Sequence, residues 1–468
     1  MSADQKYGPG VMRYVQESKK LLAQRKALIE RVKNYKFDTV AVHGLYSLEE
    51  AYDRNQGAVI EPVFMSDSQS YRDADELEAA LAYLIPTWCY TRIANPTTYY
   101  LQDILALLEG YGTGCDTSCV VTASGMSAIA MATDAFLVKQ KSGPEKINFV
   151  SSIRLYGGTF QNFNVRKKRE RGVEVRWVLH PENIQEWKSQ IDEDTRFLYM
   201  EAPSNPQQSF ADLKALADLA HSHEVPFLID ATCATPALMR PIGWGADIVL
   251  HSLTKSITAG GLAIGGAIIS RRPIITKLKN DHPLFTESFA EYIQFLPYRD
   301  QGPAASPMNA MFALNDVRTL RSRMDLVSQN CQKVAEFLHK HPRITRVDYL
   351  GLPSYDLHAL AKQYMKLVDS DDGKGAEVNR YGHLMSFRVE GPPENARKVY
   401  DNFRLIFRAT DLGRIKSVAT IPAIYGRRRD AGEARRLADI PPQLIRLCVG
   451  AEDPADIIAD LDQSLASL

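Results

Sequence analysis

The chain reads Gly245-Ala-Asp-Ile-Val-Leu-His-Ser-Leu-Thr-Lys255 where an apolar run gives way to polar residues. Such a run predicts a buried strand, and open α/β sheets bind ligands where their strands end. A desolvated lysine there can condense with an aldehyde, hydroxyl groups beside it can donate to a phosphate, and glycines let the backbone approach closely. These residues are His251, Ser252, Thr254 and Lys255, followed by Gly260, Gly261, Gly265 and Gly266. The alternative, which this stretch alone leaves open, is a solvated lysine before a flexible loop.

Upstream, Val225-Pro-Phe-Leu-Ile-Asp230-Ala-Thr232 is a second apolar run, and it ends in a carboxylate. A buried carboxylate without a partner is costly, so Asp230 should face a cation or a hydrogen-bond donor. If the partner is the nitrogen of a heterocyclic ring, the carboxylate keeps that nitrogen protonated and makes the ring an electron sink. A strand-end cap is the alternative interpretation of Asp230.

Two earlier stretches add further candidates. Val120-Val-Thr-Ala-Ser-Gly-Met-Ser-Ala128 predicts a strand, a turn of small residues and then a helix, whose first backbone N–H groups form an anion site. Ser152-Ile-Arg-Leu-Tyr-Gly-Gly-Thr159 places the ring of Tyr156 beside two glycines, which would suit stacking on a flat heterocycle. Core packing of Tyr156 remains an alternative.

The wider pattern predicts an α/β fold in several parts. From Thr98 to Leu468, apolar runs of strand length alternate with amphipathic segments of helix length, which indicates a mainly parallel sheet with helices on both faces. The runs are Cys119–Ala123, Ile147–Ser151, Val173–Leu179, Phe197–Glu201, Phe227–Asp230 and Ile248–Leu250. A chain of 468 residues is too long for one core, so we expect two domains and an arm. The expected boundaries are 1–89 for an N-terminal arm with a charged helix over 11–35, 90–305 for the large domain and 306–468 for a smaller α+β domain.

Composition excludes several classes of partner. Lys+Arg and Asp+Glu both number 56, so no net charge attracts nucleic acid or an anionic membrane. No stretch approaches eighteen consecutive apolar residues, and the N-terminus lacks the order of a secretory signal, so we expect a cytoplasmic protein. The six cysteines are scattered without metal-ligand spacing, so we expect reduced, structural cysteines and no metal. Lys366–Arg380, rich in Gly and Asp, predicts a surface loop of the smaller domain.

As a set, these stretches resemble the Cys/Met-metabolism family of pyridoxal-phosphate enzymes, and the resemblance runs from about Phe37 to Leu465. It implies fold type I, the aspartate-aminotransferase-like fold, and pyridoxal 5′-phosphate as cofactor. Within the family the chain resembles the O-acetylhomoserine sulfhydrylases, through Gly302–Ala310 and the glycine spacing after Lys255. The family motifs, in order, are Tyr90-Thr-Arg-Ile-Ala-Asn-Pro-Thr97, Ser124-Gly-Met126, Tyr156-Gly-Gly-Thr159, Glu201-Ala-Pro-Ser-Asn-Pro206, Asp230-Ala-Thr232, His251-Ser-Leu-Thr-Lys255 and Arg446-Leu-Cys-Val-Gly450.

The resemblance implies a role for each matching position. Lys255 would hold the cofactor as a Schiff base and shuttle protons, Asp230 would pair with the ring nitrogen, and Tyr156 would stack on the ring and act as acid or base. These three are the expected catalytic residues. The implied cofactor-binding residues are Tyr90, Arg92, Gly125, Met126, Tyr156, Asn205, Asp230, Thr232, Ser252, Thr254 and Lys255, of which Tyr90 and Arg92 would reach in from a neighbouring subunit. The implied substrate-binding residues are Arg446, as a clamp for the carboxylate, with Asn205, Asp411 and Leu412.

The chain departs from the family pattern near the expected substrate. Leu262 follows the lysine where relatives usually have an acidic or hydroxyl residue. Ile421 lies in Ser417–Arg429, where sulfhydrylases typically read His-Pro-Ala-Ser. Gly158 stands where methionine γ-lyases usually carry a cysteine. We therefore expect an altered substrate site.

The leading hypothesis is a transferase that carries out γ-replacement on an activated homoserine such as O-acetylhomoserine, through an aldimine and a vinylglycine ketimine, with a thiol or another nucleophile. The alternatives are a γ-lyase of the cystathionine, methionine or canavanine type, and a non-catalytic binding protein with this fold. The resemblance also implies an amino-acid substrate and a homodimer with shared active sites, assembled into a homotetramer.

Overall fold

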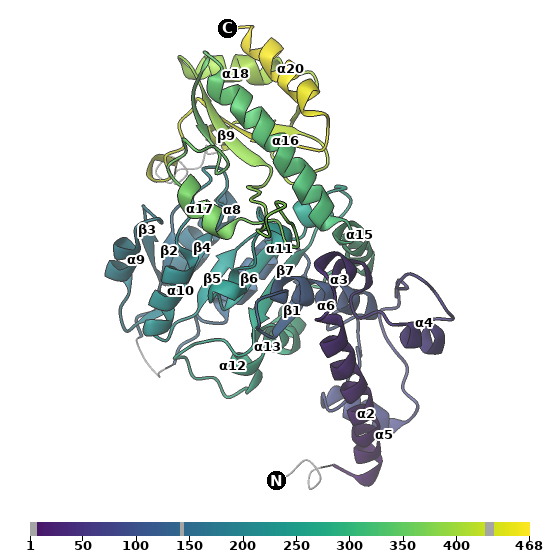
Figure 1. The fold of residues 1–468 in the computed structure, drawn as a ribbon. Helices are drawn as coiled ribbons and strands as arrows, with labels where there is room; N and C mark the ends of the chain where they lie inside the picture. Colours follow the sequence, from purple (N-terminus) through teal and green to yellow (C-terminus); the bar gives the residue numbers. More distant parts are fainter. Residues whose placement is uncertain (1–6, 141–144, 426–434) are drawn as a thin grey trace.

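The centre of the chain is a seven-stranded sheet in this computed structural model, which describes residues 7–140, 145–425 and 435–468 (Figure 1). Its strand order is β1-β7-β6-β5-β4-β2-β3. The strands are β1 (Thr117–Thr122), β2 (Asn148–Ser152), β3 (Glu174–Val178), β4 (Thr195–Glu201), β5 (Phe227–Asp230), β6 (Ile248–Ser252) and β7 (Gly266–Arg271). From β3 to β6 all neighbours are parallel, whereas β7 is antiparallel to both β1 and β6. The prediction of a mainly parallel sheet is confirmed.

The first six strands lie within two residues of the predicted apolar runs. Strand β7 is not among the predicted strands, because the glycines that precede it indicate a loop. In the structure the chain turns back after Lys255 and places β7 between β1 and β6. The lysine segment is therefore enclosed by two paired strands.

Helices cover both faces of this sheet, as the alternation predicts (Figure 1). In β5, Phe227 and Ile229 enter the core shared with α6 (Pro96–Gly110), whereas Leu228 enters the core shared with α7 (Gly125–Asp134). Since side chains of a strand alternate between faces, a fully apolar strand requires a cover on each side. The α/β class is therefore confirmed.

The C-terminal part of the chain forms a second, five-stranded sheet with the order β10-β11-β12-β9-β8. All its neighbours are antiparallel except β10 and β11. The strands are β8 (Ile344–Asp348), β9 (Leu384–Val389), β10 (Phe407–Arg408), β11 (Val418–Thr420) and β12 (Leu444–Cys448). Helices α16 (Leu320–Lys340), α18 (Pro393–Asp401) and α20 (Pro454–Leu465) gather beside it (Figure 1).

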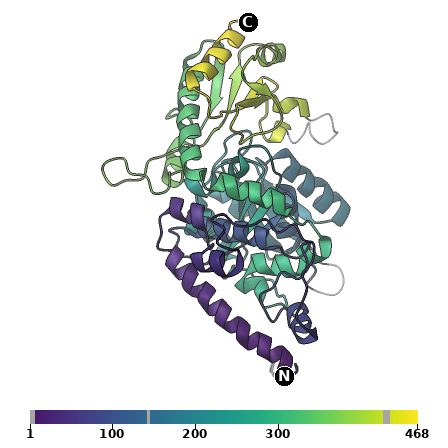
Figure 2. The ribbon, with the colours of Figure 1, turned by 90° about the vertical axis from the view of Figure 1, so that its right-hand side faces the viewer.

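The N-terminal region begins with the long helix α2 (Pro9–Val32), which runs along the outside of the body (Figure 2). Its first turns pack on α5 (Ala74–Leu81) through Val11 and Tyr14, but residues 19–27 are exposed on every side. By contrast α3 (Phe37–His43) buries Phe37 in the core of the large sheet.

The remaining helices are short. They are α4 (Leu48–Arg54), α8 (Gly157–Gln161), η1 (Asn162–Arg169), α9 (Ile184–Gln190), α10 (Leu213–Ser222), α11 (Thr235–Leu238), η2 (Pro241–Trp244), η3 (Ser256–Thr258), α12 (Leu284–Glu287), α13 (Phe289–Ile293), η4 (Gln294–Tyr298), α14 (Arg299–Gln301), α15 (Pro307–Val317), α17 (His358–Tyr364) and η5 (Pro422–Tyr425). Within the described residues, no helix combines the length and apolar composition needed to cross a membrane. All six cysteines are free, and all but Cys115 are buried.

The segment Lys366–Arg380 has an exposed tip, but its first residues are packed. Leu367 and Val368 are buried, and the amides of Lys366 and Val368 donate to carbonyl oxygens of α11 in the large domain. The stretch is thus a loop that bridges the domains. Of the predicted substrate stretch, residues 426–429 lie outside the described part of the chain.

Candidate active site

Three strands of the large sheet end side by side. Glu201, the last residue of β4, is paired with Asp230, the last residue of β5, and Asp230 is paired with Leu250 of β6. Strand β6 ends at Ser252, and Lys255 directly precedes η3. The structure therefore brings residues from separate stretches to the edge at which open α/β sheets bind ligands.

Lys255 reaches across to the second domain. Its Nζ lies 2.6 Å from Oδ1 of Asp411, and the two side chains are 24% and 29% exposed. The other carboxylate oxygen of Asp411 accepts a hydrogen bond from Nε of Arg414. Burial raises the pKa of the Asp411 carboxyl, but the bonds from Lys255 and Arg414 outweigh burial and hold this pKa below its usual value. Asp411 is therefore an ionised carboxylate at neutral pH.

Asp230 and Glu201 form a pair of buried acids. Burial raises the pKa of Asp230, and burial together with the nearby Asp230 raises the pKa of Glu201 well above its usual value. Oδ1 of Asp230 accepts the amide of Thr232 at 3.0 Å. No ion pair involves Asp230 among the described residues, so a cation bound opposite this carboxylate would relieve the cost of its burial.

The start of helix α7 offers an anion site. Ser124 caps the helix by accepting the amide of Ser127 at 3.1 Å, while the amides of Gly125 and Met126 have no acceptor within the helix. A Cβ on Gly125 would lie 2.7 Å from Cβ of Ser252, so only glycine lets β6 approach this closely. The Ser252 side chain is thus held beside two unpaired amides, an arrangement suited to a phosphate.

The remaining predicted cofactor contacts surround this point. Thr232 accepts the amide of Ser252 at 2.8 Å, and Oγ1 of Thr254 accepts the amide of Gly265 at 3.1 Å. The ring of Tyr156 is half exposed, and it lies so close to Gly158 that a Cβ there would stand 2.5 Å from ring Cε1. Tyr156 is therefore not packed in a core.

Arg446 lies on β12 and is almost fully buried. Its Nη1 donates to Oδ1 of Asn205 at 3.2 Å, and its Nη2 donates to the backbone oxygen of Asp411 at 2.5 Å. Its Nε is buried with no acceptor among the described residues. A fixed guanidinium with a free donor suits a carboxylate.

Other predicted residues make no described side-chain bond to this group. Arg92 stacks 5.6 Å from the ring centre of Tyr90 and donates to the backbone oxygen of Arg299, and no described bond joins either residue to Lys255. The Leu412 side chain is buried in a small apolar cluster with Cys233 and Cys448, so it faces the protein interior. Of the three departures, Leu262 is exposed, Ile421 is buried, and Gly158 lies against the ring of Tyr156.

Two further residues belong to the site although the sequence assigns them no role. The carboxylate of Glu201 accepts the amides of Tyr156 and Asn205, both at 2.7 Å, and so joins the loops that carry these residues. Arg414 orients Asp411. Glu201 ends a predicted strand just as Asp230 does, which is a signal that could have identified it; nothing in the sequence marks Arg414.

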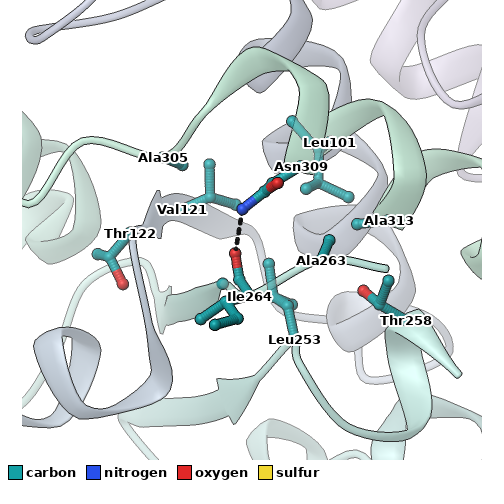
Figure 3. A pocket seen from close by; sticks show the side chains of 12 residues that line it. Leu101, Val121, Thr122, Leu253, Thr258, Ala263, Ile264, Ala305, Asn309 and Ala313 are labelled. Carbon is teal, nitrogen blue, oxygen red and sulfur yellow. Dashed lines mark hydrogen bonds between the residues drawn. The ribbon is translucent and has the colours of Figure 1, made fainter. Parts of the chain in front are cut away.

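A small cavity is lined by residues of the loop that follows Lys255 and by residues of β1 and α15 (Figure 3). Its volume is about 10 Å³, enough for one water molecule, and its walls include Leu101, Val121 and Leu253. Asn309 donates to the backbone oxygen of Ile264 at 2.9 Å and ties the loop to α15. The cavity is too small for a substrate.

Comparison with known proteins agrees with this geometry. A fold-type-I sheet with a lysine at its edge defines a class of cofactor-dependent enzymes, and residues 38–466 match the family model described as Cys/Met metabolism PLP-dependent enzyme. The chain belongs to this family, and it is therefore a pyridoxal-phosphate-dependent enzyme of sulfur amino-acid metabolism, as the sequence predicts. The family is one of enzymes, which disfavours the non-catalytic alternative.

Individual relatives cover nearly the whole chain. It is 32% identical to an L-methionine gamma-lyase of Fusobacterium nucleatum subsp. polymorphum, over 93% of this chain and 99% of that protein. It is 33% identical to a homocysteine synthase of Schizosaccharomyces pombe, over 86% and 93%. A solved structure of a candidate O-acetylhomoserine (thiol)-lyase from Campylobacter jejuni superposes with a TM-score of 0.78 at 28% identity, over 92% and 100%, and contains N′-pyridoxyl-lysine-5′-monophosphate.

The residues present fit this cofactor. The buried carboxylate of Asp230 suits a protonated ring nitrogen, and the amides of Gly125 and Met126, which have no acceptor among the described residues, suit a phosphate beside Ser252. The amine of Lys255 lies at the same edge.

Proposed function

We propose that this enzyme carries out γ-replacement on an activated homoserine such as O-acetylhomoserine, with a thiol or another nucleophile as second substrate. One observation carries the proposal: Lys255 and Arg446 both bind Asp411. The side chain of Asp411 accepts a hydrogen bond from the amine of Lys255, and its backbone oxygen accepts one from the guanidinium of Arg446. Lys255 can react with the aldehyde of a cofactor, and the free donor of Arg446 can bind a carboxylate. A site with both groups suits an α-amino acid as substrate. The homocysteine synthase among the relatives supports replacement as the outcome.

In this proposal the reacting groups come from three elements. Pyridoxal phosphate, when bound, supplies an electron-withdrawing ring that delocalises negative charge from a bound amino acid. Asp230 pairs with the ring nitrogen. Lys255 anchors the cofactor and carries protons on its Nζ, and Tyr156 covers the ring and serves as an acid or base through its hydroxyl.

The other predicted residues hold the cofactor and the substrate. Gly125 and Met126 bind the phosphate through their amides and Ser252 and Thr254 through their hydroxyls, while Thr232 supports Ser252. Asn205 contacts the ring hydroxyl. Arg446 binds the substrate carboxylate, next to Asp411 and the backbone of Leu412.

Tyr90 and Arg92 complete the phosphate site of a neighbouring subunit in this proposal. Both lie at least partly exposed, and their guanidinium–ring contact presents them as a unit. We propose a homodimer with two shared sites, assembled into a homotetramer, in the cytoplasm.

Elimination is the second candidate, because an L-methionine gamma-lyase is among the relatives. It would use the same residues without a nucleophile and release 2-oxobutanoate and ammonia. Gly158 favours replacement over this candidate: a cysteine there would require the Tyr156 ring to move, since even a Cβ would lie 2.5 Å from the ring. Relatives of the methionine γ-lyase type usually carry that cysteine.

One panel of reactions tests the proposal. O-acetylhomoserine, other homoserine esters, cystathionine, methionine and canavanine are each incubated with the enzyme, with and without sulfide, and both 2-oxobutanoate and new amino acids are quantified. We expect a new sulfur amino acid that forms only from an ester and sulfide. Formation of 2-oxobutanoate at the same rate with and without sulfide would instead support a γ-lyase.

A further inference from the structure

Asp411 is held firmly although it lies in a loop. Two residues further on, Gly413 has a φ of +77°, and a Cβ there would lie 2.5 Å from the amide nitrogen of Ser256. The amide of Ile415 donates to the oxygen of Ala259 at 3.1 Å. The turn that carries Asp411 is thus pressed against the backbone that carries Lys255, which fixes their separation.

The two carboxylate oxygens of Asp411 have different surroundings. Oδ2 is bound by Arg414, whose Nη1 also donates to the oxygen of Thr258 at 3.3 Å. Oδ1 faces the site and is bound by the Lys255 amine. When that amine is bonded to the cofactor, Oδ1 is an anionic acceptor facing the site, held in place from behind by Arg414.

The carboxylate-binding group lies next to this acceptor. Nη2 of Arg446 donates to the backbone oxygens of both Thr410 and Asp411, at 3.2 and 2.5 Å. Its buried Nε is free among the described residues. One residue, Asp411, therefore joins an acceptor for an ammonium group to a donor for a carboxylate, the two charges of an α-amino acid.

We propose that Oδ1 of Asp411 binds whichever amine is not bonded to the cofactor: the amine of Lys255 in one state, and the ammonium group of an incoming α-amino acid in the other. The inference rests on the proposed function in one respect, that the ligand is an α-amino acid. Asp411 is then a binding residue for the substrate and a positioning residue for Lys255. An anionic acceptor strengthens such bonds relative to a neutral one.

The test compares two ligands that differ only in the amine. Norleucine has no γ-leaving group, and hexanoate is the same chain without the ammonium group. Binding of both to the holoenzyme is measured by titration calorimetry for the wild type, Asp411→Asn and Asp411→Ser. We expect norleucine to bind about tenfold more weakly to both variants, because a charge-assisted hydrogen bond is lost. Hexanoate should change by less than about twofold, since it lacks the group that Asp411 binds.

Asp325→Asn is the matched control, because Asp325 is 32% exposed and bonds Nε of Arg380 at 2.5 Å, much as Asp411 bonds Arg414. It should leave both ligands unchanged. Equal weakening of norleucine and hexanoate, or none, would overturn the inference while amino-acid binding by the wild type stands. A wild type that binds no amino acid would overturn the proposed function and the inference with it. If both variants lost the visible absorbance of the cofactor, Asp411 would be needed to hold the cofactor itself. That result would also overturn the inference that Asp411 binds only free amines.

Discussion

Asp230 is the last residue of β5 and Lys255 follows the end of the paired strand β6, whereas Asp411 lies in a loop between β10 and β11. The first two are placed by the register of one sheet, and their neighbours are close in the chain. Asp411 is placed by contacts with another domain, through Lys255, Arg414 and the tight approach of Gly413. The difference shows that Asp230 and Lys255 depend on the large sheet, whereas Asp411, at the proposed substrate end, sits on a loop that can change without altering either sheet.

Replacing Lys255 should have the largest effect. Lys255→Ala should abolish turnover and the visible absorbance of bound cofactor, because alanine has no amine that could bond to the cofactor. Far-ultraviolet circular dichroism should be unchanged, since the strand register does not depend on this side chain. A variant that retains absorbance fixed to the protein by borohydride would show that another lysine is the anchor.

Asp230→Asn should cause the second-largest loss of activity. The variant should retain cofactor but lose rate by about 10²–10³-fold, the usual cost of removing a preorganised electrostatic partner. The reason is that a neutral amide no longer holds a ring nitrogen protonated. Single-turnover rates with a saturating homoserine ester measure the effect. A rate near that of the wild type would return Asp230 to the strand-cap interpretation.

Arg446→Lys tests the substrate end by itself. We expect KM to rise about 10–100-fold with little change in cofactor absorbance, because lysine cannot supply the fixed donors of a guanidinium and a charge-assisted bond is lost. Arg388→Lys, on the neighbouring strand and paired with Asp439 at 3.0 Å, serves as the control. If kcat falls while KM stays constant, Arg446 acts on the reacting groups. The proposed division between residues that bind the substrate and residues that carry out the chemistry would then be wrong.

A mixture of two inactive variants tests whether the active site contains residues of a second subunit. Arg92→Ala and Lys255→Ala should each be nearly inactive, yet recover about a quarter of wild-type activity after subunit exchange, because roughly half of the dimers would be hybrids with one intact site. Differently tagged chains verify that exchange has occurred. Hybrids without recovered activity would place Arg92 in the site of its own chain or in a structural role.

The last prediction concerns the stability of the loop and not the activity. Gly413→Ala should lower the free energy of unfolding by about 2–4 kcal/mol, through a left-handed backbone and a clash with the Lys255 segment. Gly112→Ala, at a φ of +71° with no atom within 4 Å of the added Cβ, should cost only about 1–2 kcal/mol. Urea unfolding measures both. Equal losses would mean that the close approach at Gly413 is readily relieved.

The strand-end residues could be predicted because their signal is local. An apolar run that ends in Lys255 or Asp230 specifies both the strand and the edge at which the side chain emerges. Glu201 also ends an apolar run and could have been identified in the same way. Its hydrogen bonds to Tyr156 and Asn205 join segments that are separated in sequence, so only the structure reveals that it connects these two loops.

The contacts of the loop could not be predicted in the same way. Lys255 and Asp411 are 156 residues apart, and their ion pair depends on how one domain packs on the other. The long helix over 11–35 is predicted and is observed as α2, but the exposure of its middle turns is a tertiary property that periodicity does not reveal. Strand β7 was not predicted, because the glycines that precede it indicate a loop.

Strand β7 has a consequence for how the lysine segment moves. Because Ser252 of β6 pairs directly with Gly266 of β7, residues 253–265 form a loop whose two ends are hydrogen-bonded inside the large sheet. The two ends of this loop cannot separate without breaking interior strands, so the residues next to β6 and β7 should share the protection of the sheet core against amide hydrogen exchange, whereas the exposed residues 260–262 should exchange faster. Its conformational entropy is lost when the protein folds and not when a ligand arrives, and the lysine is preorganised before any reactant binds.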